Sequence, residues 1–128
     1  DLEACLEERH YPAGQTVYAS GAVGDEIYWI RRGAVRIFLP VGAGKTRHAG
    51  TFGRGDFFGG LSFLDNRPRN HDAVAYTDTE VYALSRRNFD HLVEGHKRLG
   101  FNMLEGLART LAIRLRRADQ DLAMLNEY

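Results

Sequence analysis

The sequence of 128 residues lacks several features that mark large classes of protein. It has one cysteine, so no disulfide can form within the chain, and a reducing, cytoplasmic compartment is expected. Its 17 basic and 17 acidic residues cancel, which argues against a general nucleic-acid binder. It has no run of 18 apolar residues, so nothing in it is expected to span a membrane. We expect a single domain over 1–128, and because the sequence begins at Asp1, a fragment of a larger protein.

Motifs for catalysis or metal binding are also missing. Val41–Thr46 (VGAGKT) is similar to the end of a phosphate-binding P-loop, but the glycine required five positions before Gly44 is Leu39. The five histidines lack the H-x-H spacing that would place two imidazoles on one strand face, so no metal site is expected. No nucleophile is seen beside a base. The sequence therefore predicts no catalytic residue, no cofactor and no enzyme activity.

The sequence does contain short β-branched and aromatic runs separated by glycine turns. With no helical pattern between them, they predict an antiparallel β-roll over about residues 10–85. The predicted strands are Thr16–Tyr18, Glu26–Arg31, Ala34–Leu39, Thr46–Phe52 and Glu80–Leu84. Helices are predicted at Asp1–Arg9, at Arg86–Val93 with Phe89 and Leu92 inward, and from about Leu99 to Asn126.

The last predicted helix carries an apolar stripe. Its members are Leu104, Leu107, Leu111, Leu115, Ala118, Leu122 and Leu125. Their average spacing, near 3.5 residues, is the coiled-coil period. Two interpretations stay open at this point. The helix either packs on its own roll or pairs with a second copy to form a homodimer.

The stretch Phe57–Ala75 (FFGGLSFLDNRPRNHDAVA) predicts an anion site. A short helix that begins at a glycine pair would present free backbone N–H groups, and its dipole favours negative charge there. Arg69, nine residues beyond Gly60, would supply a bidentate fork for a phosphate. If the alternation of a strand holds after Arg69, His71 faces inward and Asp72 outward.

The same stretch resembles the phosphate-binding cassette of cyclic nucleotide-binding domains of the catabolite activator and protein kinase A regulatory type. The residues that carry the resemblance are Phe58, Gly59, Leu61, Ser62, Phe63, Leu64, Pro68, Arg69 and Ala75. Gly24-Asp25, Ile27–Ile30 and Gly33–Val35 are similar to a second motif of the family. The resemblance implies a mainly β antiparallel jelly roll (double-stranded β-helix) with short N-terminal and cassette helices and with C-terminal helices over about 86–127.

The resemblance also implies a regulatory sensor domain for cAMP or cGMP. Implied ligand-binding residues are Phe58, Gly59, Gly60, Leu61, Ser62, Arg69, Asn70 and His71, and implied lid residues on the last helix are Phe101, Leu104 and Leu107. Gly60 stands where the family has the glutamate that binds the ribose hydroxyl, which would weaken binding. The alternative is a degenerate, non-binding roll that serves as a dimerisation module, for example in the cytoplasmic part of a membrane transporter.

Overall fold

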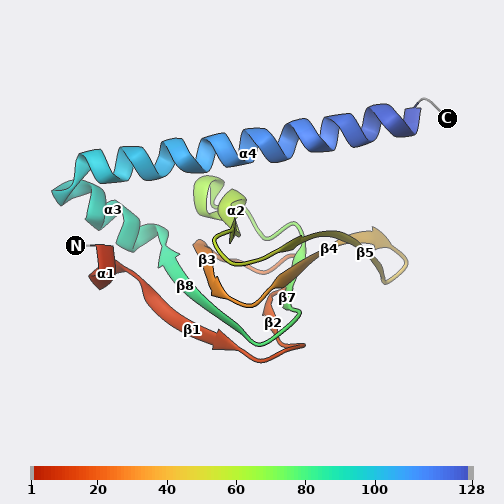
Figure 1. Cartoon of the computed structure of the whole chain (residues 1–128), viewed down its shortest axis with the longest axis horizontal. Coiled ribbons are helices and arrows are strands. Elements are labelled where there is room, and N and C mark those ends of the chain that lie inside the picture. The colour runs from red at the N-terminus through yellow and green to blue at the C-terminus, as the bar shows by residue number, and fades with distance from the viewer. Residues whose placement is uncertain (1, 127–128) are drawn as a thin grey trace. The chain divides into compact units, whose positions relative to one another are not determined.

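In this computed structural model, which describes residues 2–126, eight strands form two four-stranded antiparallel sheets (Figure 1). One sheet has the order β1 (Glu7–Tyr11), β8 (Thr79–Ser85), β3 (Glu26–Arg32) and β6 (Phe57–Phe58). The other has the order β2 (Thr16–Tyr18), β7 (Asp72–Ala75), β4 (Val35–Gly42) and β5 (Lys45–Phe52). The helices are α1 (Leu2–Cys5), α2 (Gly60–Asp65), α3 (Arg86–Gly95) and α4 (Lys97–Asn126). The predicted mainly β antiparallel roll is confirmed.

The core of the roll follows from the period-two pattern of its strands. Tyr28 and Ile30 alternate with Trp29, so both turn to the inner face of their sheet. The inner cluster contains Tyr18, Tyr28, Ile30, Val35, Ile37, Phe58, Ala73, Val81 and Ala83. Ala73 and Ala75 are 0% and 1% exposed, so their predicted inward orientation is confirmed.

A second packing centre joins α2 to the start of α3. The rings of Phe63 and Phe89 meet edge to face with centroids 5.4 Å apart. Arg86 lies above both rings, and its Nη1 donates to the carbonyl oxygens of Phe63 at 3.2 Å and Leu64 at 3.4 Å. Phe89 and Leu92 are both buried, as predicted.

The N-terminal helix is shorter than the sequence predicted. The prediction covered Asp1–Arg9, but α1 ends at Cys5 and Glu7–Tyr11 forms β1; Asp1 lies outside the described residues. β1 pairs with β8 in a continuous register, with Arg9 opposite Val81. The backbone bonds to β8 outweigh the weak helical pattern, because tertiary pairing commonly overrides local propensity.

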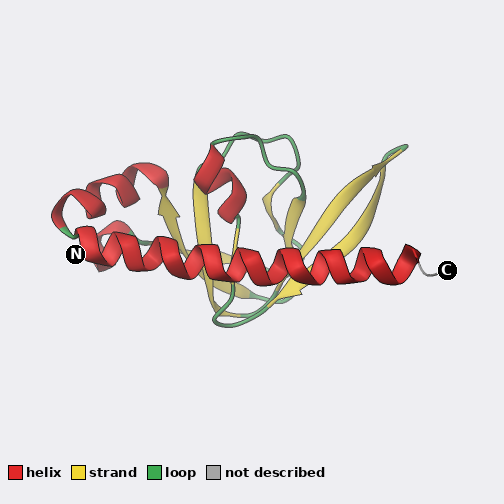
Figure 2. Ribbon diagram, turned by 90° about the horizontal axis from the view of Figure 1, so that it is seen from above, coloured by secondary structure: helices red, strands yellow, loops and turns green. Residues whose placement is uncertain are grey.

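Contacts divide the chain into a unit that ends at Asp90 and a unit that begins at His91. In the second unit α4 is one uninterrupted helix (Figure 2), as predicted from the apolar stripe. A side chain at Gly100 would bring its Cβ to 2.4 Å from Cγ2 of Val93, so glycine permits the close approach of α3 and α4. Within residues 2–126, no helix combines the length and apolar character needed to cross a membrane.

Candidate functional site

The predicted short helix after the glycine pair is present. Gly59 has φ 81°, a left-handed conformation that glycine adopts without strain, and it turns the chain from β6 into α2. α2 ends at Asn66, which is also left-handed (φ 57°) and donates its backbone N–H to the carbonyl oxygen of Ser62 at 2.9 Å. The chain then returns through Pro68 to Arg69.

Arg69 is buried, with 4% of its surface exposed. Its Nη1 donates to the carbonyl oxygen of Gly59 at 2.9 Å, and its Nη2 donates to that of Glu26 at 2.8 Å. Its Cζ lies 4.2 Å from the centre of the Tyr18 ring. The backbone of Arg69 is also held, because the N–H of Arg69 donates to the carbonyl oxygen of Ala22 at 2.9 Å. The guanidinium is thus fixed between α2, β3 and the loop that precedes β3.

The hydrogen-bonding capacity of Arg69 is only partly used. A guanidinium has five N–H donors, and the carbonyl bonds to Gly59 and Glu26 take two of them. Among residues 2–126, the buried Nε finds no hydrogen-bond partner. Leaving a buried donor unpaired costs about 1–3 kcal/mol. A Cβ at Gly24 would lie 3.0 Å from this Nε, so the loop before β3 covers it closely. The carbonyl bonds leave other donors of the guanidinium for an anion.

His71 contacts the same aromatic ring as Arg69. Its ring centre is 6.2 Å from that of Tyr18, in a stacked arrangement. Burial and the nearby charge of Arg69 lower the pKa of His71 below its ordinary value. Oδ1 of Asp72 accepts the backbone N–H of Ser20 at 2.6 Å, and this bond holds the carboxylate on the Ser20 side. Arg69 and His71 thus both pack against the ring of Tyr18.

The other residues implied by the sequence divide into two groups. Phe58, Gly60 and Ser62 are buried beside Gly59, whereas Leu61 and Asn70 are exposed. The lid candidates all lie on α4 in the second unit, where Leu107 is buried and Phe101 and Leu104 are exposed. Their role over a ligand stays a prediction.

Sequence reasoning missed a polar network on β1 and β3. Arg9 forms two hydrogen bonds with the Glu26 carboxylate, Nη1 to Oε1 at 2.7 Å and Nη2 to Oε2 at 2.5 Å. The hydroxyl of Tyr28 also donates to Oε1, at 2.9 Å. Burial raises the pKa of Glu26, but the bonds from Arg9 and Tyr28 outweigh burial and leave this pKa below its ordinary value. The sequence does contain one signal for this network. Glu26 stands two positions before Tyr28, and the alternation of a strand places both side chains on one face.

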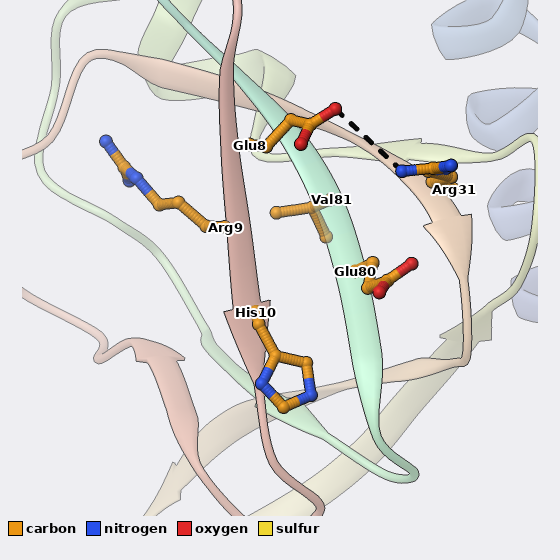
Figure 3. Close-up of a pocket in the computed structure, with 6 residues that line it drawn as sticks. All are labelled: Glu8, Arg9, His10, Arg31, Glu80 and Val81. Carbon is orange, nitrogen blue, oxygen red and sulfur yellow. Dashed lines mark ion pairs between the residues drawn. The ribbon is translucent and has the colours of Figure 1, made fainter.

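A hollow with a volume of about 230 Å³, here called the outer hollow, lies beside β1, β8 and β3. Figure 3 shows its lining residues: Glu8, Arg9, His10, Arg31, Glu80 and Val81. Arg31 and Glu8 form a long ion pair of 3.8 Å, and both side chains are more than half exposed. Charges of both signs alternate here, and among the described residues no group of His, Cys, Asp or Glu is arranged to hold a metal ion. The hollow therefore offers no concentrated charge for a ligand.

Comparison with known sequences gives consistent matches. The family model described as cyclic nucleotide-binding domain matches residues 8–96. A cyclic AMP receptor protein from Thermus thermophilus is 36% identical over 121 residues, which cover 94% of this chain and 54% of the relative. A cAMP-dependent protein kinase regulatory subunit from Aspergillus fumigatus is 39% identical over 88 residues, which cover 69% of this chain and 21% of the relative.

Comparison with solved structures finds proteins of the same kind as the sequence comparison. The catabolite activator protein of Thermus thermophilus superposes with a TM-score of 0.84 at 36% identity, over 96% of this chain and 56% of that one. A cyclic nucleotide-binding domain from Methylobacillus flagellatus superposes with a TM-score of 0.86 at 25% identity, over 91% of this chain and 65% of that one. The chain thus spans about half of each Thermus relative.

Proposed function

Because this chain belongs to the cyclic nucleotide-binding domain family, we propose that it is a regulatory sensor domain that binds cAMP or cGMP and performs no chemistry of its own. One observation carries the proposal. The buried guanidinium of Arg69 lies beside the turn at Gly59 and uses two of its five donors on carbonyl oxygens, and an anionic phosphodiester would supply further acceptors. The proposed place of action is the cytoplasm, as part of a transporter or a transcription factor.

In the proposed complex the cyclic phosphate lies between Arg69 and the chain at Gly59 and Gly60. Phe58, Leu61 and Ser62 border it on the cassette side, and Asn70 and His71 border it on the side of β7. The proposed lid residues are Phe101, Leu104 and Leu107 on α4. The signal is the ligand's differential affinity for two positions of α4, because a ligand shifts only an equilibrium whose states it binds unequally.

Isothermal titration calorimetry with cAMP and cGMP, taken to millimolar concentration, tests the proposal. We expect Arg69→Ala to weaken binding by about 100-fold, since it removes charge-assisted bonds that contribute about 1.5–3 kcal/mol each. The control is Arg67→Ala, which removes an exposed arginine two residues away. Heat from neither nucleotide, or equal binding by the two variants, would refute the sensor function.

A second function, dimerisation through α4, is favoured by an independent observation. Leu115 and Leu122 belong to the predicted apolar stripe and are 62% and 58% exposed. The 3.5-residue spacing suits a second copy of the same helix. This proposal holds whether or not a nucleotide binds, so it also describes a degenerate roll kept as an interaction module.

Light scattering tests the dimer directly. The wild type should have the mass of two chains with and without nucleotide, and Leu115→Asp or Leu111→Asp should reduce it to one. Gln120→Asp, on another side of the helix by its spacing, is the control. A wild-type monomer at micromolar concentration would rule this second function out.

A further inference from the structure

Arg36 lies on the outer face of the sheet formed by β2, β7, β4 and β5. Its neighbours Val35 and Ile37 are 0% and 3% exposed and belong to the inner core cluster, so the alternation of β4 turns Arg36 and Phe38 outward. In the register of the sheet, Arg36 is opposite Val74 of β7. The residues that we call the Arg36 face are Arg36, Phe38, His48, Val74 and Tyr76.

The guanidinium of Arg36 is stacked on an aromatic ring. Its Cζ lies 3.6 Å from the centre of the Tyr76 ring. Tyr76 follows β7 directly, and its backbone N–H donates to the carbonyl oxygen of Ala34 at 2.9 Å, yet the residue is 53% exposed. Stacking fixes the plane of a guanidinium and leaves the N–H groups in that plane for another acceptor. Arg36 is therefore oriented for binding by a contact that uses none of its donors.

The guanidinium of Arg36 has no acceptor in this structure. Within residues 2–126 it forms no hydrogen bond and no ion pair, although the residue is half-buried. Its Nε is fully buried without a partner, so the two Nη groups are the donors that a second molecule can reach. A polar group that is partly removed from water and left unpaired lowers stability and calls for an explanation.

The carboxylates of β7 and of the turn after it are already engaged. Oδ1 of Asp72 accepts the backbone N–H of Ser20 at 2.6 Å, and Oδ1 of Asp78 accepts that of Ala13 at 3.2 Å. The chain has 17 basic and 17 acidic residues, so it has no general attraction for a polyanion such as a nucleic acid. A single carboxylate therefore complements Arg36 better than a run of phosphates does.

Apolar side chains lie beside this cation. The rings of Phe38 and His48 are tilted against each other with centres 5.6 Å apart, and Nε2 of His48 is hydrogen-bonded to Oγ1 of Thr51 at 2.9 Å. Phe38 and Val74 are only half-buried, so apolar surface remains accessible next to Arg36. Arginine and aromatic residues are the types that are enriched where proteins bind one another.

We propose that the Arg36 face is a docking surface for a protein segment that presents a carboxylate beside apolar side chains. The carboxylate accepts hydrogen bonds from the two Nη groups of Arg36, and the apolar side chains pack on Phe38 and Val74. This inference does not rest on nucleotide binding. Arg69 contacts Tyr18 of the inner core cluster, whereas Arg36 is on the outer face.

The test uses a short fluorescent peptide that carries two glutamates among leucines and serines, and a matched peptide with glutamine in place of each glutamate. Fluorescence anisotropy gives the dissociation constant of each. We expect the wild type to bind the glutamate peptide about 10-fold more tightly, as hydrogen bonds between charged groups predict. In Arg36→Met this preference should disappear, because the variant keeps the apolar stem and has no donor.

Control variants separate docking from a structural role. Arg54→Met removes an exposed arginine of the same unit and should keep the full preference. Arg36→Lys keeps the charge but not the planar fork, and should keep only part of it. In urea denaturation Arg36→Met should have the midpoint of the wild type or a higher one, since its guanidinium has no acceptor to lose. Excess cAMP should not displace the peptide.

Several outcomes would overturn the docking surface and leave the sensor function untouched. These are equal binding of the two peptides by the wild type, a preference that survives in Arg36→Met, and a clearly lower urea midpoint of Arg36→Met. Displacement of the peptide by cAMP would assign it to the Arg69 site. Tighter, Arg36-dependent binding of a single-stranded oligonucleotide would identify a nucleic-acid surface, and a smaller light-scattering mass of Arg36→Met would identify a contact between copies of this chain.

Discussion

Arg69 binds the start of β3 and Arg31 belongs to the same strand, but the two arginines differ in burial. Arg69 is 4% exposed and is held by two backbone carbonyl oxygens, with its Nε unpaired among the described residues. The Arg31 side chain is 56% exposed and meets Glu8 at 3.8 Å. Water can satisfy the donors of Arg31 but not those of Arg69. Burial, rather than residue type or proximity to a carboxylate, therefore separates a candidate binding group from an ordinary surface charge.

The largest expected effect comes from crowding the buried arginine. Gly24→Val places a Cβ about 3.0 Å from Nε of Arg69, and the two carbonyl bonds leave the guanidinium little freedom to withdraw. We expect a loss of about 2 kcal/mol of stability in urea denaturation, together with weaker nucleotide binding. Gly53→Val is the matched control, because a Cβ there meets nothing within 4 Å. Equal losses for the two variants would contradict the tight fit around Arg69.

A smaller effect is expected from the inner ion pair. Arg9→Met leaves the half-buried Glu26 carboxylate without its cation and should cost about 1–2 kcal/mol at pH 7. Since the folded pKa of Glu26 is lowered, the stability that the pair contributes is present above the unfolded pKa and is lost as pH falls through the folded one. The difference between wild type and Arg9→Met in urea denaturation should therefore shrink in acid. A difference that is independent of pH would contradict this account.

The next prediction concerns the pH dependence of nucleotide affinity. The pKa of His71 is lowered in the free protein by burial and by Arg69, so stability falls as pH drops through the ordinary value of 6.5. A phosphate bound at Arg69 would raise this pKa, and binding would then take up a proton. Besides Arg69, the charged or titratable groups near the ring are Tyr18, which stacks on it, and Asp72, which is bound to Ser20.

Nucleotide affinity should accordingly rise several-fold between about pH 8 and pH 5.5, within the limit of about 10-fold per unit of pKa change. Calorimetry in buffers of different ionisation enthalpy measures the proton uptake. His71→Gln should remove the pH dependence, and His91→Gln, an exposed histidine on α3, should retain it. A pH dependence that survives in His71→Gln would assign the effect to another group.

The smallest effect is expected at the outer hollow. Arg31→Met breaks a long, exposed ion pair and should change the free energy of unfolding by less than about 0.5 kcal/mol. Nucleotide binding should not change. A loss of stability as large as that of Arg9→Met would contradict the expected difference between the exposed and the half-buried ion pair.

Much of the roll could be predicted because its signals are local. The pattern of Ile27–Ile30 and the glycine turns predicted where the strands lie and which side chains face inward. Gly59-Gly60 predicted the start of α2. The N-terminal strand was missed because Glu7–Tyr11 has no β pattern of its own, and only its pairing with β8 makes it a strand. Glu26 was missed for a similar reason. Its carboxylate meets Arg9 only because β1 and β3 both pair with β8, and the two strands are far apart in sequence.

Arg86 gives the cassette helix a mechanical link to the next element. Its guanidinium binds the last carbonyl oxygens of α2 and packs over Phe63, while its backbone begins α3. A displacement of α2 must therefore either carry the first turn of α3 with it or break these bonds. A movement of α2 would therefore be transmitted to α3 by the side chain of Arg86, which stands directly after β8.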